Sequence, residues 1–412
     1  MDSSLSPRFL SVSLLLVGAC ASEAAPRQGQ PGSPCVRPAP QSASSPIVIP
    51  DVDPPCTLVF EESGVQLLPD SAGTRPDPGR RVVRDSRGIH YSANATGFPA
   101  TVAVWAADGT YMRTMGRPGE GPGELSTRGA LGLYMDSRDR VHVRDGGISW
   151  SVFTPAFEFE RKVPLARGGT TDQTAVLDDG TILMADAGSS GGQKVFRVMA
   201  IDTLDLPAAN GPRVLSAATS IREFGEVDAA KVAAGARAER PIAYAGGASF
   251  WAAPGAWDGT GYTLEEWSTD GTLLRTIRRD VPWFPVGAKP PERVREGQPR
   301  SNTPPPPAFG QIHLDAEGLL ITFIGVANDR WRPEQGSFAE REAAQEEMYD
   351  AVVEVIDTRA GALLASERML AADALSRIAH WFFSGQASGY RVEETPLGLP
   401  VVKILDYRLV AR

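Results

Sequence analysis

LYMDSRDRVHVRD, residues 133–145, places an apolar run before a polar turn and alternating apolar residues after it. Because successive side chains of a strand point to opposite faces, this pattern predicts two short strands joined by a tight turn. The form, with Asp opening the turn, recurs in VVRDSRGIHYSA (82–93), AVLDDGTILMADA (175–187) and IHLDAEGLLITFIG (312–325). Two copies lack the Asp: YAGGASFWAAP (244–254) and WFFSGQASGYRVEE (381–394). The chain is therefore expected to be an array of repeated units.

A second hairpin follows the first in each unit. Period-two apolar residues flank a turn in VAVWAADGTYMRTM (102–115), WSVFTPAFEFERKVPL (150–165), FRVMAIDTLDL (196–206), LEEWSTDGTLLRTI (264–277) and VVEVIDTRAGALLASERM (352–369). Asp-Gly favours such turns because both residues tolerate a positive φ. A sixth hairpin is expected in PLGLPVVKILDYRLV (396–410), with CTLVFEESGVQLL (56–68) pairing beside it. Each unit therefore has four strands.

Four-stranded units repeated around an axis are typical of a β-propeller. We predict an all-β, six-bladed β-propeller over residues 56–412. GRPGEGPGEL (116–125) then forms the crossing from the first blade to the second. It is a poor phosphate loop because no helix follows it and its two prolines lack N–H donors.

MGRPGEGPGEL (115–125) and VHVRDGGISWSVFTPAFEFERKV (141–163) resemble the inter-blade motif and blade pattern of NHL-repeat-like six-bladed β-propellers. The resemblance implies this fold and an exported bacterial lipoprotein, and it implies no particular reaction. The blades here are longer than usual because of insertions at 220–240, 285–310 and 332–350. The first and third have helix-forming composition and the second is expected to be extended. These insertions either roof the central channel or decorate the surface.

The N-terminus predicts export. Residues 1–19 have Arg8, then an apolar stretch and small residues, in the order of a signal peptide. Val-Gly-Ala-Cys (17–20) is similar to a bacterial lipobox, which implies lipidation of Cys20 and anchoring to the outer membrane. Cleavage after Ala21 by an ordinary signal peptidase is the alternative. Residues 20–55 are rich in Pro and Ser and are expected to form a disordered tether.

Charge argues against nucleic acid as a partner. The net charge is −9, whereas binding to a phosphate backbone depends on clustered Lys and Arg. The two short basic runs, Arg80-Arg81 and Arg278-Arg279, are interpreted as solvated edges. We expect a monomer that associates with the membrane through its lipid.

The three cysteines leave one open question. Export places Cys35 and Cys56 where a disulfide can form. Cys35 lies in the expected tether, so the paired and unpaired states remain equal alternatives.

Four histidines are candidates for chemistry. His90 and His142 are interpreted as equivalent positions in successive units, and His313 precedes its turn. Some six-bladed lyases place histidines around the channel to bind a divalent metal, so these three are the candidate metal ligands. The alternative is that they only flank strands, because a zinc site needs three or four converging ligands. The turn aspartates, namely Asp85, Asp136, Asp178 and Asp315, are interpreted as structural.

Aromatic side chains suggest a ligand surface. Trp105, Trp150 and Trp267 lie in period-two strands and are expected in the core, whereas Trp251, Trp257 and Trp331 lie near loops and are candidate ligand contacts. The sequence favours a non-enzymatic binding module for a peptide, glycan or protein, with no cofactor. The alternative is a metal-dependent hydrolase or lyase that uses the channel histidines.

Overall fold

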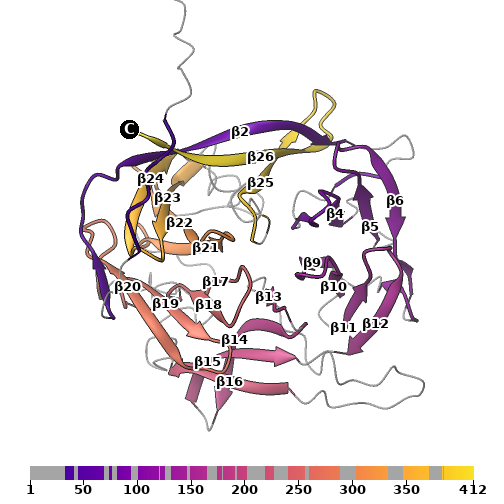
Figure 1. The fold of residues 1–412 in the computed structure, drawn as a ribbon, viewed down its shortest axis with the longest axis horizontal. Coiled ribbons are helices and arrows are strands. Elements are labelled where there is room, and N and C mark those ends of the chain that lie inside the picture. The colour runs from indigo at the N-terminus through magenta and orange to yellow at the C-terminus, as the bar shows by residue number, and fades with distance from the viewer. Residues whose placement is uncertain are drawn as a thin grey trace, which may run out of the picture.

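In the computed structural model, six β-sheets stand in a ring around a central axis (Figure 1). Nearly all of the described secondary structure is strand, so the predicted β-propeller is confirmed. The structure describes residues 33–40, 45–68, 74–76, 81–93, 101–119, 121–125, 131–145, 149–164, 174–178, 180–190, 193–201, 219–226, 240–255, 259–287, 303–332, 347–370, 383 and 385–412.

The first three blades each have four antiparallel strands in chain order, from the axis outwards. The first contains β3 (Val83–Arg84), β4 (His90–Ala93), β5 (Val102–Trp105) and β6 (Tyr111–Met115). The second contains β9 (Leu131–Met135), β10 (Val141–Asp145), β11 (Ser149–Phe153) and β12 (Phe159–Pro164). The third contains β13 (Thr174–Val176), β14 (Ile182–Ser190), β15 (Gln193–Ile201) and β16 (Thr219–Glu226).

The remaining blades follow the same order but recruit the N-terminal segment. The fourth contains β17 (Ile242–Ala243), β18 (Ser249–Ala252), β19 (Tyr262–Ser268) and β20 (Leu273–Arg279). The fifth contains β21 (Ala308–Leu314), β22 (Leu319–Ala327), β23 (Tyr349–Asp357) and β24 (Ala362–Met369). The sixth has three strands, β25 (Ser388–Glu394), β26 (Pro400–Ala411) and β2 (Cys56–Leu67).

The sixth blade closes the ring by joining the two ends of the propeller sequence. β2 pairs antiparallel with β26, from Cys56 opposite Ala411 to Leu67 opposite Val402. This confirms the pairing expected for 56–68. The predicted hairpin within 396–410 is wrong: this segment is mostly the single strand β26, and its hairpin partner is β25. The turn lies earlier, where Gly398 takes a φ of 72° and donates its N–H to Thr395.

Part of the segment that was expected to be a disordered tether is ordered. Residues 47–49 form β1 (Ile47–Ile49), which pairs in parallel with the outer strand β20. Cys35 and Cys56 form a disulfide with their Cα atoms 5.8 Å apart, and Arg37 donates to the Asp357 carboxylate at 2.7 Å. Residues 33–40 and 45–55 thus lie against the propeller, because β-branched residues extend an open sheet edge and the disulfide holds the preceding segment near β26.

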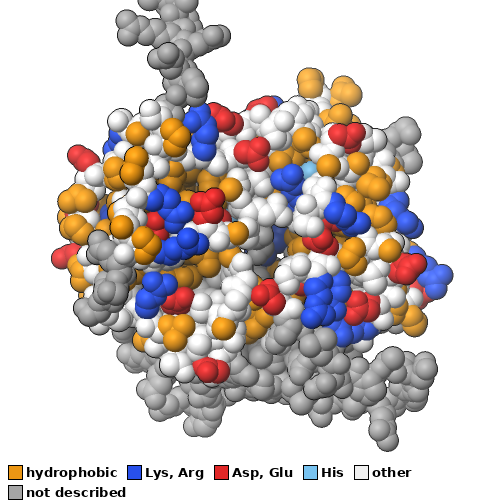
Figure 2. Space-filling model, viewed as in Figure 1, with side chains coloured by type: hydrophobic (Ala, Val, Ile, Leu, Met, Phe, Trp, Pro, Cys, Tyr) orange, Lys and Arg blue, Asp and Glu red, His pale blue; other side chains and the backbone are white. Residues whose placement is uncertain are grey.

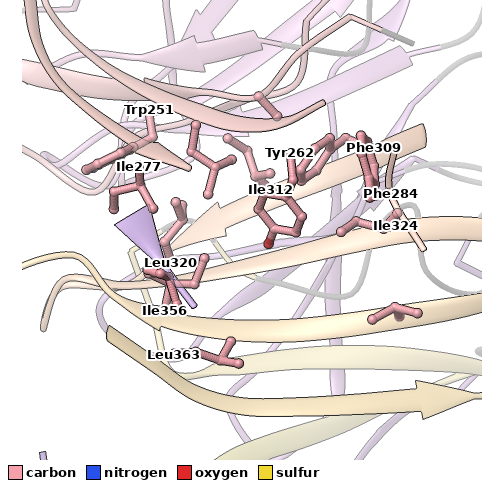
Figure 3. Close-up of a cluster of buried hydrophobic side chains, with 14 of the residues drawn as sticks. Trp251, Tyr262, Ile277, Phe284, Phe309, Ile312, Leu320, Ile324, Ile356 and Leu363 are labelled. Carbon is pink, nitrogen blue, oxygen red and sulfur yellow. The ribbon is translucent and has the colours of Figure 1, made fainter. Parts of the chain in front are cut away.

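The core lies between neighbouring blades. Trp105 and Trp150 are fully buried and Trp267 nearly so, as predicted. Figure 3 shows the cluster between the fourth and fifth blades, where Trp251, Tyr262 and Leu320 pack together. The Tyr262 hydroxyl lies 3.0 Å from that of Thr322 in the facing sheet. Flat faces packed in this way need no further layer to cover them.

One predicted insertion is partly strand. Residues 220–226 were expected to belong to a helical insertion, but they lie in β16, which pairs with β15. The hairpin expected within 196–206 is also wrong, since β15 ends at Ile201 and its partner begins at Thr219. This short segment is extended because it pairs with the open edge of β15, and the pairing satisfies the backbone N–H and C=O groups of both strands. Amino-acid composition does not reveal such pairing. Of the other predicted helical insertion, 332–350, residues 333–346 lie outside the described residues, and its last two residues begin strand β23.

The glycine-rich stretch forms a corner between blades. Arg117–Pro118 (β7) pairs in parallel with Glu124–Leu125 (β8), and Gly116 and Gly123 have φ values of 77° and 71°. A Cβ on Gly123 would lie 3.3 Å from Phe159 in the next blade. Glycine is needed here both for the positive φ and for the close approach.

Candidate ligand site in the central cavity

Three of the turn aspartates have the same structural role. In each, one carboxylate oxygen accepts the backbone N–H groups two and four residues later, as in Asp136 with Arg138 at 3.0 Å and Arg140 at 2.9 Å. The same pair of bonds is made by Asp85 and by Asp315. Such bonds close the turn on itself and confirm the structural interpretation of these three residues.

Asp178 occupies a different position. In the third blade the turn is closed between Leu177 and Thr181, so Leu177 takes the place that aspartate takes elsewhere. The exposed Asp178 carboxylate instead accepts the N–H of Gly247 in the next blade at 3.0 Å. The sequence alignment of this copy was therefore wrong by one residue.

The same kind of offset separates two of the candidate histidines. His90 is the fifth residue after Asp85, whereas His142 is the sixth after Asp136. In the strand pairing, the residue equivalent to His142 is Tyr91, whose hydroxyl likewise bonds its turn aspartate, at 3.0 Å. Because strand side chains alternate, one residue of offset places the two imidazoles on opposite faces of their sheets. The predicted equivalence of His90 and His142 is wrong.

His142 is held inside the second blade. Its Nδ1 accepts a hydrogen bond from the Trp150 indole at 2.8 Å, so the ring proton lies on Nε2 and is donated to Asp136 at 3.0 Å. Burial lowers the pKa of His142, which keeps the imidazole neutral. Burial raises the pKa of the Asp136 carboxyl, but the bonds from His142 and Arg140 outweigh it and lower the pKa to about 2.

His90 and His313 lie in other surroundings. The centres of the His90 and Phe383 rings lie 5.9 Å apart, and His313 Nε2 lies 3.0 Å from the carbonyl oxygen of Gln386. Burial lowers the pKa of each to about 4. The described residues contain no group of three or more His, Cys, Asp or Glu side chains placed to hold a metal ion. Each of the three imidazoles therefore has its own set of neighbours. The fourth histidine, His380, lies outside the described part of the chain.

The inner strands of the propeller surround a cavity of about 50 Å³ on the axis, which we name the central cavity. Figure 2 shows the face of the molecule hollowed at this point. Every blade contributes to its wall: Arg81–Arg84, Tyr134, Met135, Thr174–Val176, Ile242–Tyr244, Gln311–Leu314 and Phe383. The site is thus built from segments more than 300 residues apart, which only ring closure brings together.

The wall of the central cavity carries positive charge. Among the residues that the structure describes, Arg81 and Arg84 line it and no Asp or Glu does. The Arg81 guanidinium lies 5.3 Å from the centre of the Tyr134 ring, which in turn stacks on Trp150 at 5.1 Å. Arg84 Nη1 donates to the hydroxyl of Ser388 at 3.2 Å. Both cations are therefore held in place by the propeller itself.

Sequence reasoning assigned Arg81 to a solvated edge, and this was wrong. So was the same assignment of Arg279, which is buried and lies 3.1 Å from Glu354. The signal that could have identified Arg81 is its place four residues before a turn aspartate, the same place that Gln311 takes in the fifth blade. Both residues line the central cavity.

The candidate tryptophans do not form one surface. Trp251 is buried in the core between blades, and the Arg275 guanidinium lies 5.5 Å from the centre of its ring. Its assignment as a ligand contact is therefore wrong. Its strand pairs on both sides, which a loop-based interpretation did not foresee. Trp331 is half-buried and its indole donates to the Tyr349 hydroxyl at 3.4 Å. Trp257 lies outside the described residues, as does Cys20.

No known protein family and no curated protein matches the sequence. Solved structures do match the fold. A Bacteroides fragilis protein named for its expected export is similar over 88% of this chain and 99% of its own, with 11% identity and a TM-score of 0.50. The WD40 β-propeller domain of Doa1 covers 84% of this chain and 97% of its own, with 13% identity and a TM-score of 0.37. An oligogalacturonate lyase in complex with manganese is similar over 86% of this chain and 98% of its own, with 9% identity and a TM-score of 0.41.

Identities this low show the fold alone. The class that the fold defines is that of the β-propellers. Among the described residues, no helix is long and apolar enough to cross a membrane.

Proposed function

We propose that this protein is an exported, lipid-anchored binding module of the bacterial envelope, with a peptide, glycan or protein as its ligand. Export is supported by the signal-like N-terminus and by the name of the Bacteroides fragilis propeller that it resembles. Anchoring rests on the lipobox-like residues that end at Cys20. Lipid chains contribute about 0.8 kcal/mol per buried methylene, so several of them hold a protein stably at a bilayer.

The observation that carries a binding role is the central cavity. All six blades line it, and its wall presents polar side chains at the axis, where ligands of concave sites are held. The histidines, by contrast, have separate neighbours. Binding therefore accounts for the arrangement better than metal-assisted hydrolysis or elimination.

The anchoring part of the proposal is tested with a Cys20→Ala variant expressed in a Gram-negative host. The wild-type protein should sediment with outer membranes and incorporate labelled palmitate, whereas the variant should do neither. A Cys35→Ser/Cys56→Ser double variant serves as the control, because it removes the other two cysteines but keeps Cys20. Membrane recovery of Cys20→Ala equal to that of the wild type would contradict the proposal.

The binding part is tested on the purified mature protein with a panel of short peptides and glycan fragments. A ligand that binds only the folded state raises the free energy of unfolding, by about 2.7 kcal/mol at a hundred times its Kd. Thermal unfolding with each compound measures this effect. The same panel is incubated with and without Mn²⁺ or Zn²⁺ and examined by mass spectrometry. Cleavage of a compound that requires the metal would replace the binding role with the catalytic alternative.

A further inference from the structure

We propose that the central cavity binds an oxyanion, the carboxylate or phosphate group of a small ligand, through Arg81, Arg84 and Thr174. The inference rests on the proposed binding function and adds the chemical class of the ligand. It has three supports: uncompensated charge, unpartnered buried donors and the fixed positions of the two cations.

The first support is charge. Several other buried or half-buried arginines have a carboxylate partner, for example Arg140 with Asp136 at 2.7 Å and Arg279 with Glu354 at 3.1 Å. Within the described part of the chain, neither Arg81 nor Arg84 belongs to an ion pair. No acidic side chain of the described ranges lines the central cavity either. Two cations that face an axial cavity without counter-charges attract an anion, and the low-dielectric walls strengthen that attraction.

The second support is a set of polar atoms left without partners. Arg84 Nε and Thr174 Oγ1 are both buried, and neither has a hydrogen-bond partner among the described residues. Thr174 is only 5% exposed and lies on the wall of the central cavity. Buried polar groups are nearly always hydrogen-bonded, so two such donors at one cavity indicate a missing acceptor. An oxyanion supplies acceptors to both.

The third support is how the cations are held. Ser388 Oγ accepts from Arg84 Nη1 at 3.2 Å, and the backbone carbonyl of Arg84 accepts from Gln386 at 3.0 Å. Arg81 lies over Tyr134, which is itself stacked on Trp150. Side chains that are already ordered lose little freedom on binding, which favours affinity for a small group.

Size limits what can enter. A cavity of about 50 Å³ has room for a carboxylate or a phosphate group. The rest of the ligand would therefore extend out of the channel. Arginine suits such a group because its planar fork pairs with two oxygens at once.

The test is isothermal titration calorimetry of the mature protein with inorganic phosphate, with acetate and with acetamide as a neutral analogue of acetate. We expect one site for at least one of the two anions and no binding of acetamide. The anion that binds more tightly identifies the group, phosphate or carboxylate. Absence of binding by both anions to the folded protein would overturn the inference, as would equal binding of acetamide.

Variants locate the site. Arg84→Gln and Thr174→Val should each weaken anion binding at least tenfold, whereas Arg138→Gln should leave it unchanged. Arg138 is an exposed turn residue of the second blade, and its substitution by Gln removes the same charge as Arg84→Gln does. If Arg84→Gln does not fold, Arg81→Gln replaces it. Equal weakening by Arg138→Gln, or less than twofold weakening by the cavity variants, would refute the assignment.

Failure here remains distinct from failure of the proposed function. If the anions do not bind but a neutral peptide or glycan of the panel does, only the ligand class is wrong. If nothing in either experiment binds, the binding role itself is lost.

Discussion

Asp136→Asn tests whether the turn aspartates hold the propeller together. The carboxylate accepts two backbone N–H groups with one oxygen, and the Arg140 guanidinium at 2.7 Å and His142 at 3.0 Å with the other. An Asn keeps the first oxygen but turns an NH₂ group toward two donors. Each pKa unit is worth about 1.4 kcal/mol. The fall of the Asp136 pKa from 3.8 to about 2 thus makes its ionised form worth about 2 kcal/mol.

Leaving the buried donors of Arg140 and His142 without an acceptor adds a further cost of about 1 to 3 kcal/mol. We therefore expect Asp136→Asn to lower the free energy of unfolding by about 3 to 5 kcal/mol, in line with breaking a buried ion pair. Urea unfolding followed by tryptophan fluorescence measures this difference. The matched control is Asp178→Asn, which changes an exposed turn carboxylate with one backbone bond and should cost less than about 1 kcal/mol.

The pH dependence follows from the same group. Because the folded pKa of Asp136 lies below its ordinary value, its contribution is present above about pH 4 and is lost as the pH falls toward 2. The difference in stability between wild type and Asp136→Asn should therefore narrow over that interval. A constant difference from pH 6 to pH 2, or equal costs for Asp136→Asn and Asp178→Asn, would refute this account of the turn.

Two further perturbations test ring closure and turn geometry. Replacing Cys35 and Cys56 together by Ser opens a link across 21 residues and should cost about 3 kcal/mol of stability, with chemical reduction of the wild type giving the same loss. No loss would show that the N-terminal segment holds its place without the disulfide. Gly271→Ala forces a side chain to a φ of 100° in open space and should cost about 1 to 2 kcal/mol. Gly109→Ala should cost at least twice as much, because its Cβ would overlap the carbonyl oxygen of Gln66 in β2; equal thermal shifts for the two variants would contradict that packing.

Much of the fold follows from local patterns. Alternating apolar residues and Asp-Gly turns identified most strands of the first, second, fourth and fifth blades, because strand faces and turn conformations depend on neighbours in the chain. The hairpin around Gly109 lies where ADG predicted it, between β5 and β6. The third blade was harder, since β15 and β16 are separated by a long connection and turn chemistry gives no help there.

The candidate site was less accessible to sequence reasoning. Arg81, Thr174 and Gln311 come from three different blades, and nothing local marks them as facing the axis. The histidines were easier to notice because they are rare, but an offset of one residue in the Asp turn was enough to misplace His142 relative to His90.

The sequence by itself determined that this chain forms repeated antiparallel strands, where most of its tight turns fall, and that Trp105, Trp150 and Trp267 are buried. Tertiary structure alone decided that the N-terminal segment lies along the outer edges of the blades and that two arginines face an axial cavity. The physical reason is that turns and alternation depend on residues a few positions apart. The axis, in contrast, exists only after β2 has paired with β26 and closed the ring.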